Sequence, residues 1–334
     1  MYGSRIPSLT LSNTLVDAMK FNRDGYSRLQ VQVSTGKKYL ARSDDPIDTN
    51  EAATLQNTTA QLNQWRKNVN TCVDWEKATD SVLQSILETM QRANEVVVEA
   101  NDGTNAANRA TIAEEIDGVI ESLVNGANSK YTGRYLFGGV GGTGMTGVDP
   151  FAITRDASGK ITSVDYQGST DRRVVQISDT GSTQYGLVGE GTASGTPDED
   201  IGIFKFENYE NTAAEGDPAD WQNVEVGIFD TLINLRDSLR NSDFTDWEKK
   251  LNRVQSGLDH VITKVIDNAT SQQKFERIVG NIDALESSQV SRLSDLEDLD
   301  MAVAFNNLTM MQTNLQASLQ MITRMNALSI VNFI

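Results

Sequence analysis

The chain contains few of the side chains on which most enzymes and metal sites depend. Its 334 residues include one histidine, His260, and one cysteine, Cys72. A structural zinc site needs four nitrogen or sulfur ligands, and a Ser-His-Asp triad needs a histidine beside its nucleophile. A single cysteine also excludes an internal disulfide. The composition therefore removes most metal and nucleophile chemistry and leaves an enzyme that uses carboxylates alone as the alternative. We predict a protein that is not an enzyme, with no catalytic residue, no cofactor and no bound metal.

Basic residues are also scarce. Lys and Arg number 29 against 46 Asp and Glu, which gives a formal net charge of -17. Nucleic-acid binding depends on clustered Lys and Arg, so this balance opposes it. No apolar run approaches the roughly 20 residues of a membrane helix, and residues 1–20 lack the apolar core of a secretory signal. We therefore expect neither nucleic acid nor a membrane as partner.

Prolines and glycines divide the sequence into three parts. The five prolines fall at positions 7, 46, 150, 197 and 218, so residues 47–149 and 219–334 lack the residue that breaks helices. Fifteen of the 25 glycines lie between Gly138 and Gly216. The sequence thus predicts a mainly α fold with a small inserted β domain, its long helices forming an elongated bundle or coiled coil.

Apolar residues recur every seven positions after Pro46, with a second series three positions later, as in a coiled coil. Asp45 suits the N-cap of this helix, and Pro46 suits its first position. A similar spacing follows Thr245, where Thr245 and Glu248 fit a capping box. We predict a bundle seam made of Leu55, Leu62, Trp65, Val69, Leu83, Ile86, Met90, Leu251, Val254 and Leu258.

The two ends of the chain carry matching apolar stripes. Arg324 is the one charged residue from Met301 to Ile334, so electrostatic repulsion offers this segment little protection against association. A lone helix is marginal in water without a packing partner. The predicted assembly interface consists of Leu15, Met19, Tyr26, Leu29, Val33, Leu308, Met311, Leu315, Leu319 and Ile322. An ordinary hairpin within one chain explains the pattern equally well.

The middle of the chain changes to strand-like patterns. Residues 151–155 and 160–166 predict a β-hairpin, and 172–177, 185–188 and 201–206 predict further short strands. Residues 141–220 carry fourteen acids and five bases. We expect this segment to form a solvated acidic domain that projects from the helices. The helical part then divides into terminal helices, 1–42 and 286–334, which form the inner coiled coil, and a bundle, 43–140 and 221–285.

Three motifs that could indicate ligand binding have simpler explanations. Gly139, Gly141 and Gly144 match G-x-G-x-x-G, but the residues up to Pro150 cannot continue as the helix that a dinucleotide site needs. Residues 34–38 resemble the end of a P-loop, yet Val31 stands where its first glycine belongs. The acids at 198–200 lack the spacing of an EF-hand. We interpret these motifs as a hinge, a turn and a solvated loop.

Several segments resemble the flagellin-like axial proteins of the bacterial flagellum, and specifically the members found at the hook-filament junction. The similar segments are Gln32–Lys38 followed by Ser43–Pro46, then Ala127–Gly139, then Ala317–Gln320 with Leu328–Ile334. Flagellins usually differ in the second and third of these segments. The resemblance covers residues 1–140 and 245–334, whereas the acidic middle varies in the family.

The resemblance implies a structural adaptor that joins the hook, through hook-associated protein 1, to the flagellin filament. It also implies a ring of copies of the chain assembled through the terminal helices. Export would run through the flagellar type III apparatus without a cleaved signal peptide. An export chaperone would cover the C-terminal helix beforehand. The exported protein would be located in the extracellular flagellum. The alternatives are a flagellin, as bulk filament subunit, and an enzyme or adhesin housed in residues 141–220.

Overall fold

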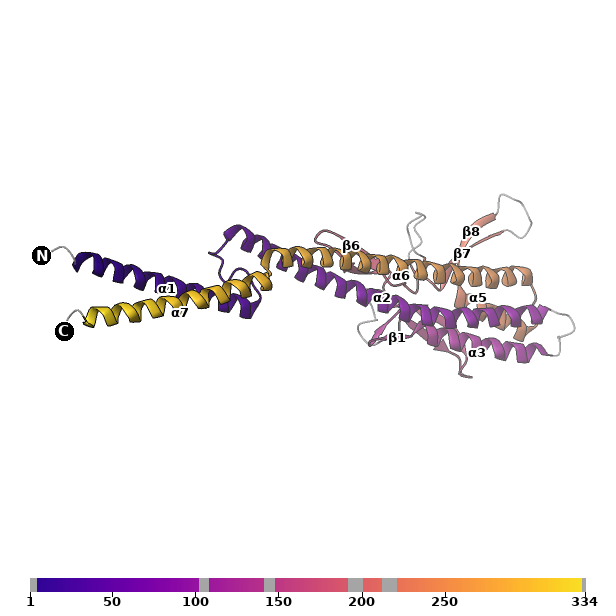
Figure 1. The fold of residues 1–334 in the computed structure, drawn as a ribbon. Helices are drawn as coiled ribbons and strands as arrows, with labels where there is room; N and C mark the ends of the chain where they lie inside the picture. The colour runs from indigo at the N-terminus through magenta and orange to yellow at the C-terminus, as the bar shows by residue number, and fades with distance from the viewer. Residues whose placement is uncertain (1–4, 102–107, 141–147, 192–200, 212–220, 332–334) are drawn as a thin grey trace. The chain divides into compact units, whose positions relative to one another are not determined.

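The computed structural model describes residues 5–101, 108–140, 148–191, 201–211 and 221–331 (Figure 1). The chain divides into two compact units. The terminal unit comprises Met1–Asn63 and Ala284–Ile334, and the central unit comprises Gln64–Asp283. The finer division into terminal helices, bundle and acidic domain stays a prediction.

Long helices dominate both units, as the distribution of prolines predicts. They are α1 (Arg5–Thr35), α2 (Pro46–Asn101), α3 (Arg109–Ala127), α5 (Ile228–Asn241), α6 (Trp247–Glu297) and α7 (Met301–Val331). The predicted start of α2 is confirmed, because the Asp45 carboxylate accepts hydrogen bonds from the backbone N–H groups of Ile47 and Asp48 at 3.0 and 3.1 Å. The mainly α fold class with a β-containing insertion is confirmed as well.

The strands form two-stranded antiparallel sheets. They pair β1 (Lys130–Tyr131) with β2 (Arg134–Tyr135), β3 (Phe151–Arg155) with β4 (Ile161–Tyr166), β5 (Arg173–Gln176) with β6 (Ser182–Tyr185), and β7 (Lys205–Asn211) with β8 (Trp221–Gly227). The predicted hairpin at 151–166 is confirmed, with a register shift between Thr154 and Arg155. The predicted strand at 172–177 corresponds to β5.

Two of the predicted strands are wrong, and so is a part of the predicted bundle. The apolar residues of segments 185–188 and 201–206 contribute to the core, since Leu187, Val188, Ile203 and Phe204 are buried. Most of the backbone of these segments is nevertheless irregular. The strands lie nearby instead, as β6 and β7. Residues 221–227, assigned to the helical bundle, form strand β8.

The predicted capping box at Thr245 is also wrong. Helix α6 begins at Trp247, and the preceding residue, Asp246, has a φ of 53°. The N–H and hydroxyl of Thr245 both donate to the Asp243 carboxylate, at 3.1 and 2.7 Å. Because the helix begins at Trp247, Thr245 and Glu248 do not occupy the N-cap and N3 positions that a capping box requires.

The core of the central unit joins helices and strands. A continuous set of buried apolar side chains runs from α2, α3, α5 and α6 to the β segments. The ring of Phe204 lies 4.9 Å from that of Phe151, 5.0 Å from that of Phe229 and 5.9 Å from that of Phe137, between ring centroids. Such pairs stabilise a fold by about 0.5–1.5 kcal/mol each. The described β segments therefore contribute buried side chains to the helical core.

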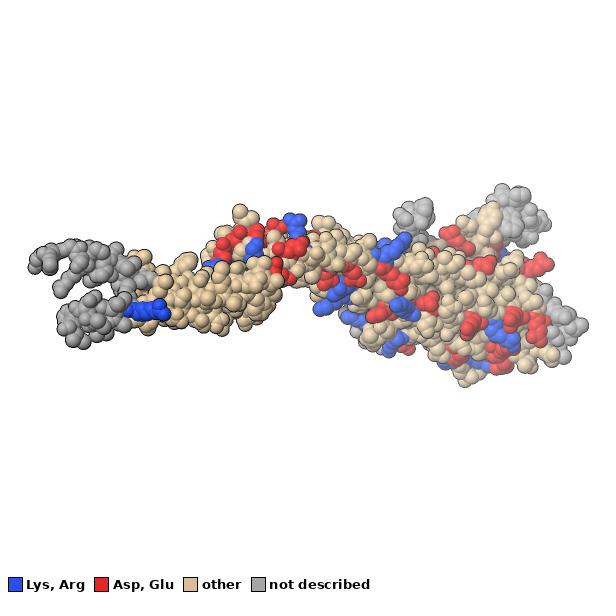
Figure 2. All heavy atoms as spheres, viewed as in Figure 1, with Lys and Arg blue, Asp and Glu red and all other residues tan. Residues whose placement is uncertain are grey.

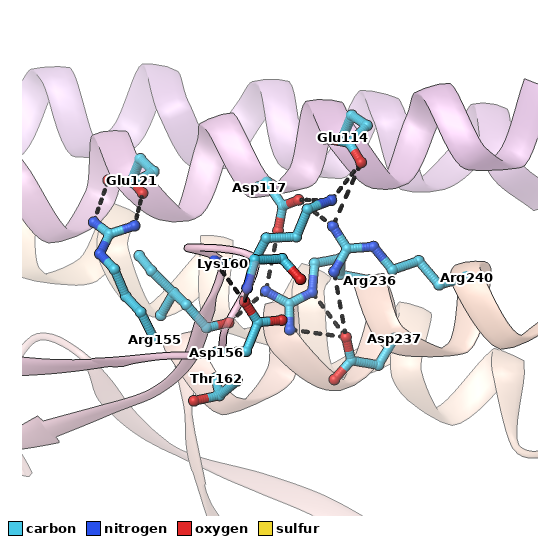
Figure 3. Close-up of polar contacts among 12 residues, drawn as sticks. Glu114, Asp117, Glu121, Arg155, Asp156, Lys160, Thr162, Arg236, Asp237 and Arg240 are labelled. Carbon is cyan, nitrogen blue, oxygen red and sulfur yellow. Dashed lines mark hydrogen bonds and ion pairs between the residues drawn. The ribbon is translucent and has the colours of Figure 1, made fainter.

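A network of ion pairs fixes the β3–β4 hairpin between α3 and α5 (Figure 3). The guanidinium of Arg236, which is 2% exposed, donates to Asp117 at 3.0 Å and to the carbonyl of Ile161 at 2.6 Å. Lys160 lies 3.2 Å from Asp117, and Arg240 also pairs with Asp117. Because breaking a buried ion pair leaves an uncompensated charge, this network strongly favours a single arrangement of the three elements.

Candidate assembly surface

Helices α1 and α7 lie side by side and antiparallel in the terminal unit (Figure 1). The Asn22 amide donates to the Ser318 hydroxyl at 3.3 Å. Farther along, a Cβ added to Gly25 would lie 3.1 Å from Cε of Met311. Nearer the connection to the rest of the chain, the N–H of Leu299 donates to the carbonyl of Gly36 at 2.9 Å. The contacting residue numbers rise along α1 and fall along α7, as an antiparallel pair requires.

Most of the predicted interface residues lie along this pair of helices. The half-buried ones are Met19, Tyr26, Leu29, Val33, Leu308, Met311, Leu315 and Ile322. Leu319 is 48% exposed, and the side chain of Leu15 lies outside the described residues. Along α7, Ala304 is 2% exposed and completes a 4-3 spacing with the half-buried positions. We call Ala304, Leu308, Met311, Leu315, Ser318 and Ile322 the α7 seam. It covers α1 within one chain, so the stripe identified in the sequence serves the intramolecular pair in this structure.

Several large apolar residues that the sequence interpretation left out lie on the surface of the same two helices. They are Phe21, Val31, Val303, Phe305, Met310 and Met321, with exposed fractions of 45–72%. For the four residues of α7 the signal that could have found them is their position one residue before or after a position of the α7 seam. Exposed apolar area of this kind, collected on one pair of helices, is typical of a protein-protein interface.

Charge is distributed unevenly over the chain. The pair of terminal helices shows a broad uncharged face, whereas acids and bases are interspersed over the rest of the visible surface (Figure 2). From Met301 to Thr323, α7 carries no charged residue. The charged residues of α1 from Asp17 to Arg28 are exposed and partly paired, as in Asp17 with Lys20 at 3.8 Å. A partner of α7 therefore meets hydrophobic contacts and amides rather than ion pairs.

The residues of the first family-like segment hold the base of the α1–α7 pair. Gly36, with a φ of +70°, ends the first helix, and the N–H of Lys38 donates to the carbonyl of Glu297 at 2.7 Å. The Lys37 ammonium lies 3.0 Å from the Glu297 carboxylate.

Asp44 accepts hydrogen bonds from the N–H groups of Leu40 and Ala41, which lower the pKa of its carboxyl. Arg28 pairs with the same carboxylate at 2.7 Å. These contacts fix the turn from which both terminal helices extend.

The second family-like segment is built into the central core. Tyr135, Leu136 and Phe137 are each at most 2% exposed. The Asn128 side chain donates to the carbonyl of Phe151 and accepts from its N–H, both at 3.0 Å. The segment therefore positions β3 from inside the core, while residues 130 and 132–134 are exposed.

The predicted bundle-seam residues lie in both units. Six of them, Leu83, Ile86, Met90, Leu251, Val254 and Leu258, contact the core of the central unit. Leu55, Leu62 and Val69 are buried outside that core, and Trp65 is half-buried.

The residues considered in the sequence as candidates for catalysis or ligand binding have structural roles where the structure describes them. Cys72 is 1% exposed, and burial raises the pKa of its thiol to about 12, which disfavours the reactive thiolate. A ring nitrogen of His260 lies 2.9 Å from the carbonyl of Gly202. A Cβ on Gly139 would lie 2.2 Å from the carbonyl oxygen of Ser169, so this glycine is required for close packing. The other motif glycines, Gly141 and Gly144, and the acids at 198–200 lie outside the described residues.

In the part of the chain that the structure describes, no group of three or more His, Cys, Asp or Glu side chains is arranged to hold a metal ion. Nor does any described helix combine the length and apolar character needed to cross a membrane.

The fold and the uncharged terminal surface together define a class: a helical structural protein whose two ends pair and expose apolar residues. Comparison with known proteins specifies it further. Residues 6–141 match the bacterial flagellin N-terminal helical region, and residues 258–334 match the bacterial flagellin C-terminal helical region. The two matches together span more than half of the chain. The chain belongs to the flagellin family.

Similar proteins come from several bacteria. The chain is 27% identical over 343 aligned positions to a flagellar hook-associated protein 3 of Escherichia coli K12, covering 99% of this chain and 96% of that one. It is 28% identical to flagellar hook-associated protein 3 of Salmonella typhimurium, covering 91% and 92%. The fold is similar to that of the flagellar junction protein FlgL of Legionella pneumophila, with a TM-score of 0.53 and 14% identity over 74% of this chain and 100% of that one. A second Legionella pneumophila structure, of flagellar hook associated protein-3, has a TM-score of 0.57 and 12% identity, covering 73% and 98%.

Proposed function

We propose that this chain is a structural adaptor of the bacterial flagellum that joins the hook to the flagellin filament. The observation that carries the proposal is the surface of the α1–α7 pair, which is uncharged along most of α7 and exposes Val303, Phe305 and Met310. Such a surface suits permanent assembly better than free existence in water. The names of the full-length relatives, flagellar hook-associated protein 3, support the junction rather than the bulk filament.

The proposed partners follow from this position. Hook-associated protein 1 lies on the hook side, flagellin on the filament side, and further copies of the chain complete a ring. Export through the flagellar type III apparatus brings the protein to the extracellular flagellum. Because α7 exposes large apolar residues before assembly, an export chaperone on α7 gives this surface a temporary partner. The adaptor performs no catalysis.

Substitution in α7 tests the assembly role. In the double variant Leu315→Asp with Leu319→Asp, a charge enters the α7 seam and another enters the exposed apolar surface. We expect assembly to be lost while the central unit stays folded, since all four tryptophans and the buried core lie outside α7. The matched control is Thr313→Asp, at an exposed position of α7 away from the seam. Normal assembly of the double variant would refute the proposal.

Seeding separates the adaptor from a flagellin. Full-length protein is mixed either with filament fragments or with hook-associated protein 1 and viewed by negative-stain electron microscopy. An adaptor gives short caps on hook-associated protein 1 and no long filaments. Long filaments grown by this chain alone identify a flagellin instead.

A further inference from the structure

A polar cavity of about 320 Å³ lies between α5 and the first turns of α6, within the central unit. On α5, Asn234, Ser238 and Asn241 line it at 4-3 spacing and so share one face of the helix. On α6, Lys250 and Arg253 line it one turn apart. Every side chain described in the lining is polar or charged, and the volume falls at the lower end of the roughly 300–1,000 Å³ of small-molecule sites. The cavity therefore suits a small polar ligand.

Lys250 supplies this cavity with a positive charge that no neighbouring carboxylate balances directly. Its half-buried ammonium donates to the Ser238 hydroxyl at 2.7 Å, and no carboxylate that the structure describes lies within ion-pair distance of it. Arg253 differs, because its guanidinium binds both oxygens of Glu210, which is 5% exposed. The lining therefore accommodates one negative charge of a ligand, at Lys250.

Two carboxylates in the same lining restrict that ligand further. Asp237 contacts Arg236 and Arg240 through its Oδ1 (Figure 3). Asp243 accepts hydrogen bonds from the N–H and the hydroxyl of Thr245, also through Oδ1. Among the described residues, Oδ2 of either carboxylate has no hydrogen-bond partner. Because a carboxylate accepts hydrogen bonds from hydroxyl groups and repels a second negative charge, a fitting ligand carries several hydroxyls and one charge.

The amides of Asn234 and Asn241 add groups that both donate and accept. Both side chains are exposed, and neither amide is hydrogen-bonded within the described part of the chain. A hydroxyl group also donates and accepts, so an amide can bind it in either direction. The amides therefore favour a ligand with hydroxyl groups, while Lys250 selects its charge.

We propose that the α5–α6 cavity binds a monoanionic, polyhydroxylated small molecule of the size of one acidic sugar. The carboxylate of the ligand pairs with Lys250, and its hydroxyl groups bond Asp237, Asp243 and the two amides. The lining belongs to the central unit and shares no residue with the α1–α7 pair. This binding function is therefore independent of the proposed assembly function, and either can fail without the other.

Comparison of related ligands tests the proposed chemistry. Isothermal titration calorimetry at about pH 7.5 measures the binding of D-glucuronate to the full-length protein. D-Glucose lacks the charge, acetate lacks the hydroxyl groups, and glucose 6-phosphate carries a charge of about -1.5 to -2. We expect glucuronate to bind at least about tenfold more tightly than each of these three. The absence of glucuronate binding, or equal or tighter binding of any of the three, overturns the proposal.

A glucuronide that carries a second sugar distinguishes two sources of the same chemistry. Its binding with an affinity equal to that of glucuronate indicates the end of a glycan. Its exclusion indicates a free sugar acid.

Substitutions in the lining test the assigned contacts. Lys250→Gln keeps a donor for Ser238 and removes the charge, so it should lower the affinity for glucuronate at least about tenfold. Asn234→Ala removes one amide at an exposed position of α5 and should lower the affinity about threefold to tenfold. The matched control is Lys77→Gln, at an exposed position of α2 outside the lining, which should leave the affinity within about twofold.

Unfolding followed by tryptophan fluorescence verifies that each variant is folded. Equal losses in Lys250→Gln and Lys77→Gln assign the binding to overall charge and overturn the site. Unchanged affinity in both Lys250→Gln and Asn234→Ala overturns it as well.

Discussion

The central unit and the α1–α7 pair are built from similar helices but bury very different fractions of their side chains. In the central unit, a continuous core from α2 to α6 includes Leu83, Ile116 and Leu232, each with 0% exposure. In the α1–α7 pair, Ala304 is the one buried residue among the described side chains, and its neighbours Val303 and Phe305 are about half exposed. Two helices alone cannot enclose a core, because each shields one stripe of the other.

The difference in burial indicates that the central unit folds within one chain, whereas the terminal pair leaves apolar side chains available for assembly. The central unit has enough buried apolar area to fold within one chain, and its ion-pair network fixes how α3, α5 and the β3–β4 hairpin meet (Figure 3). The terminal pair leaves apolar area uncovered, and the proposed assembly would cover it. Variants whose effects we expect to differ between the two regions test this contrast.

We expect the largest effect from Arg236→Ala in the central unit. This substitution removes the buried guanidinium that bonds Asp117 and the carbonyl of Ile161, and should lower the free energy of unfolding by about 3–5 kcal/mol. Guanidinium unfolding followed by tryptophan fluorescence measures it, since all four tryptophans belong to the central unit. As control, Arg92→Ala removes an exposed ion pair with Glu115 and should leave the unfolding midpoint unchanged. Equal effects at both positions contradict the role of burial.

A pair of leucine substitutions compares the two regions directly. Leu83→Ala creates a cavity in the central core and should cost about 2–5 kcal/mol in the fluorescence transition. Leu308→Ala, at a half-buried seam position of α7, should leave this transition unchanged and reduce helical circular dichroism from the terminal pair. If Leu308→Ala shifts the fluorescence midpoint as far as Leu83→Ala, the two regions do not unfold independently.

The smallest effect concerns a buried carboxyl of the central unit. Glu76 is 2% exposed and accepts a hydrogen bond from the N–H of Gly186 at 2.9 Å. Burial raises the pKa of its carboxyl above the ordinary 4.5, while the Gly186 bond and Arg172 partly oppose this shift. The unfolded chain therefore loses this proton at a lower pH than the folded chain, and stability from this group falls as pH rises from about 4.5 through the raised folded pKa.

Glu76→Gln keeps an oxygen to accept the Gly186 bond and removes the titration. We expect the variant to be more stable than the parent at pH 7.5 and to lose this advantage near pH 4, as measured by thermal unfolding at both values. An advantage that is independent of pH assigns the effect to packing rather than to the charge.

Local signals in the sequence predicted the features that depend on few neighbours. Asp45 and Pro46 specify the start of α2 because the cap is formed within a few residues. The heptads predicted burial of Leu83, Ile86 and Met90, since periodicity alone identifies one face of a helix. Prediction failed at Thr245, because the helix begins only at Trp247, and at 185–188, where an apolar segment crosses the core without forming a strand for most of its length.

The sequence alone determined the helical class of this protein, the start of α2, the scarcity of chemical groups and the lack of charge along α7, because each follows from composition or from spacing along one element. Tertiary structure alone decided that Arg236 is buried against Asp117, that the β segments share the helical core, and that α1 covers the α7 seam while Met310 and Phe305 remain exposed. These features depend on which faces meet across large separations in the chain, and periodicity identifies a face without identifying its partner.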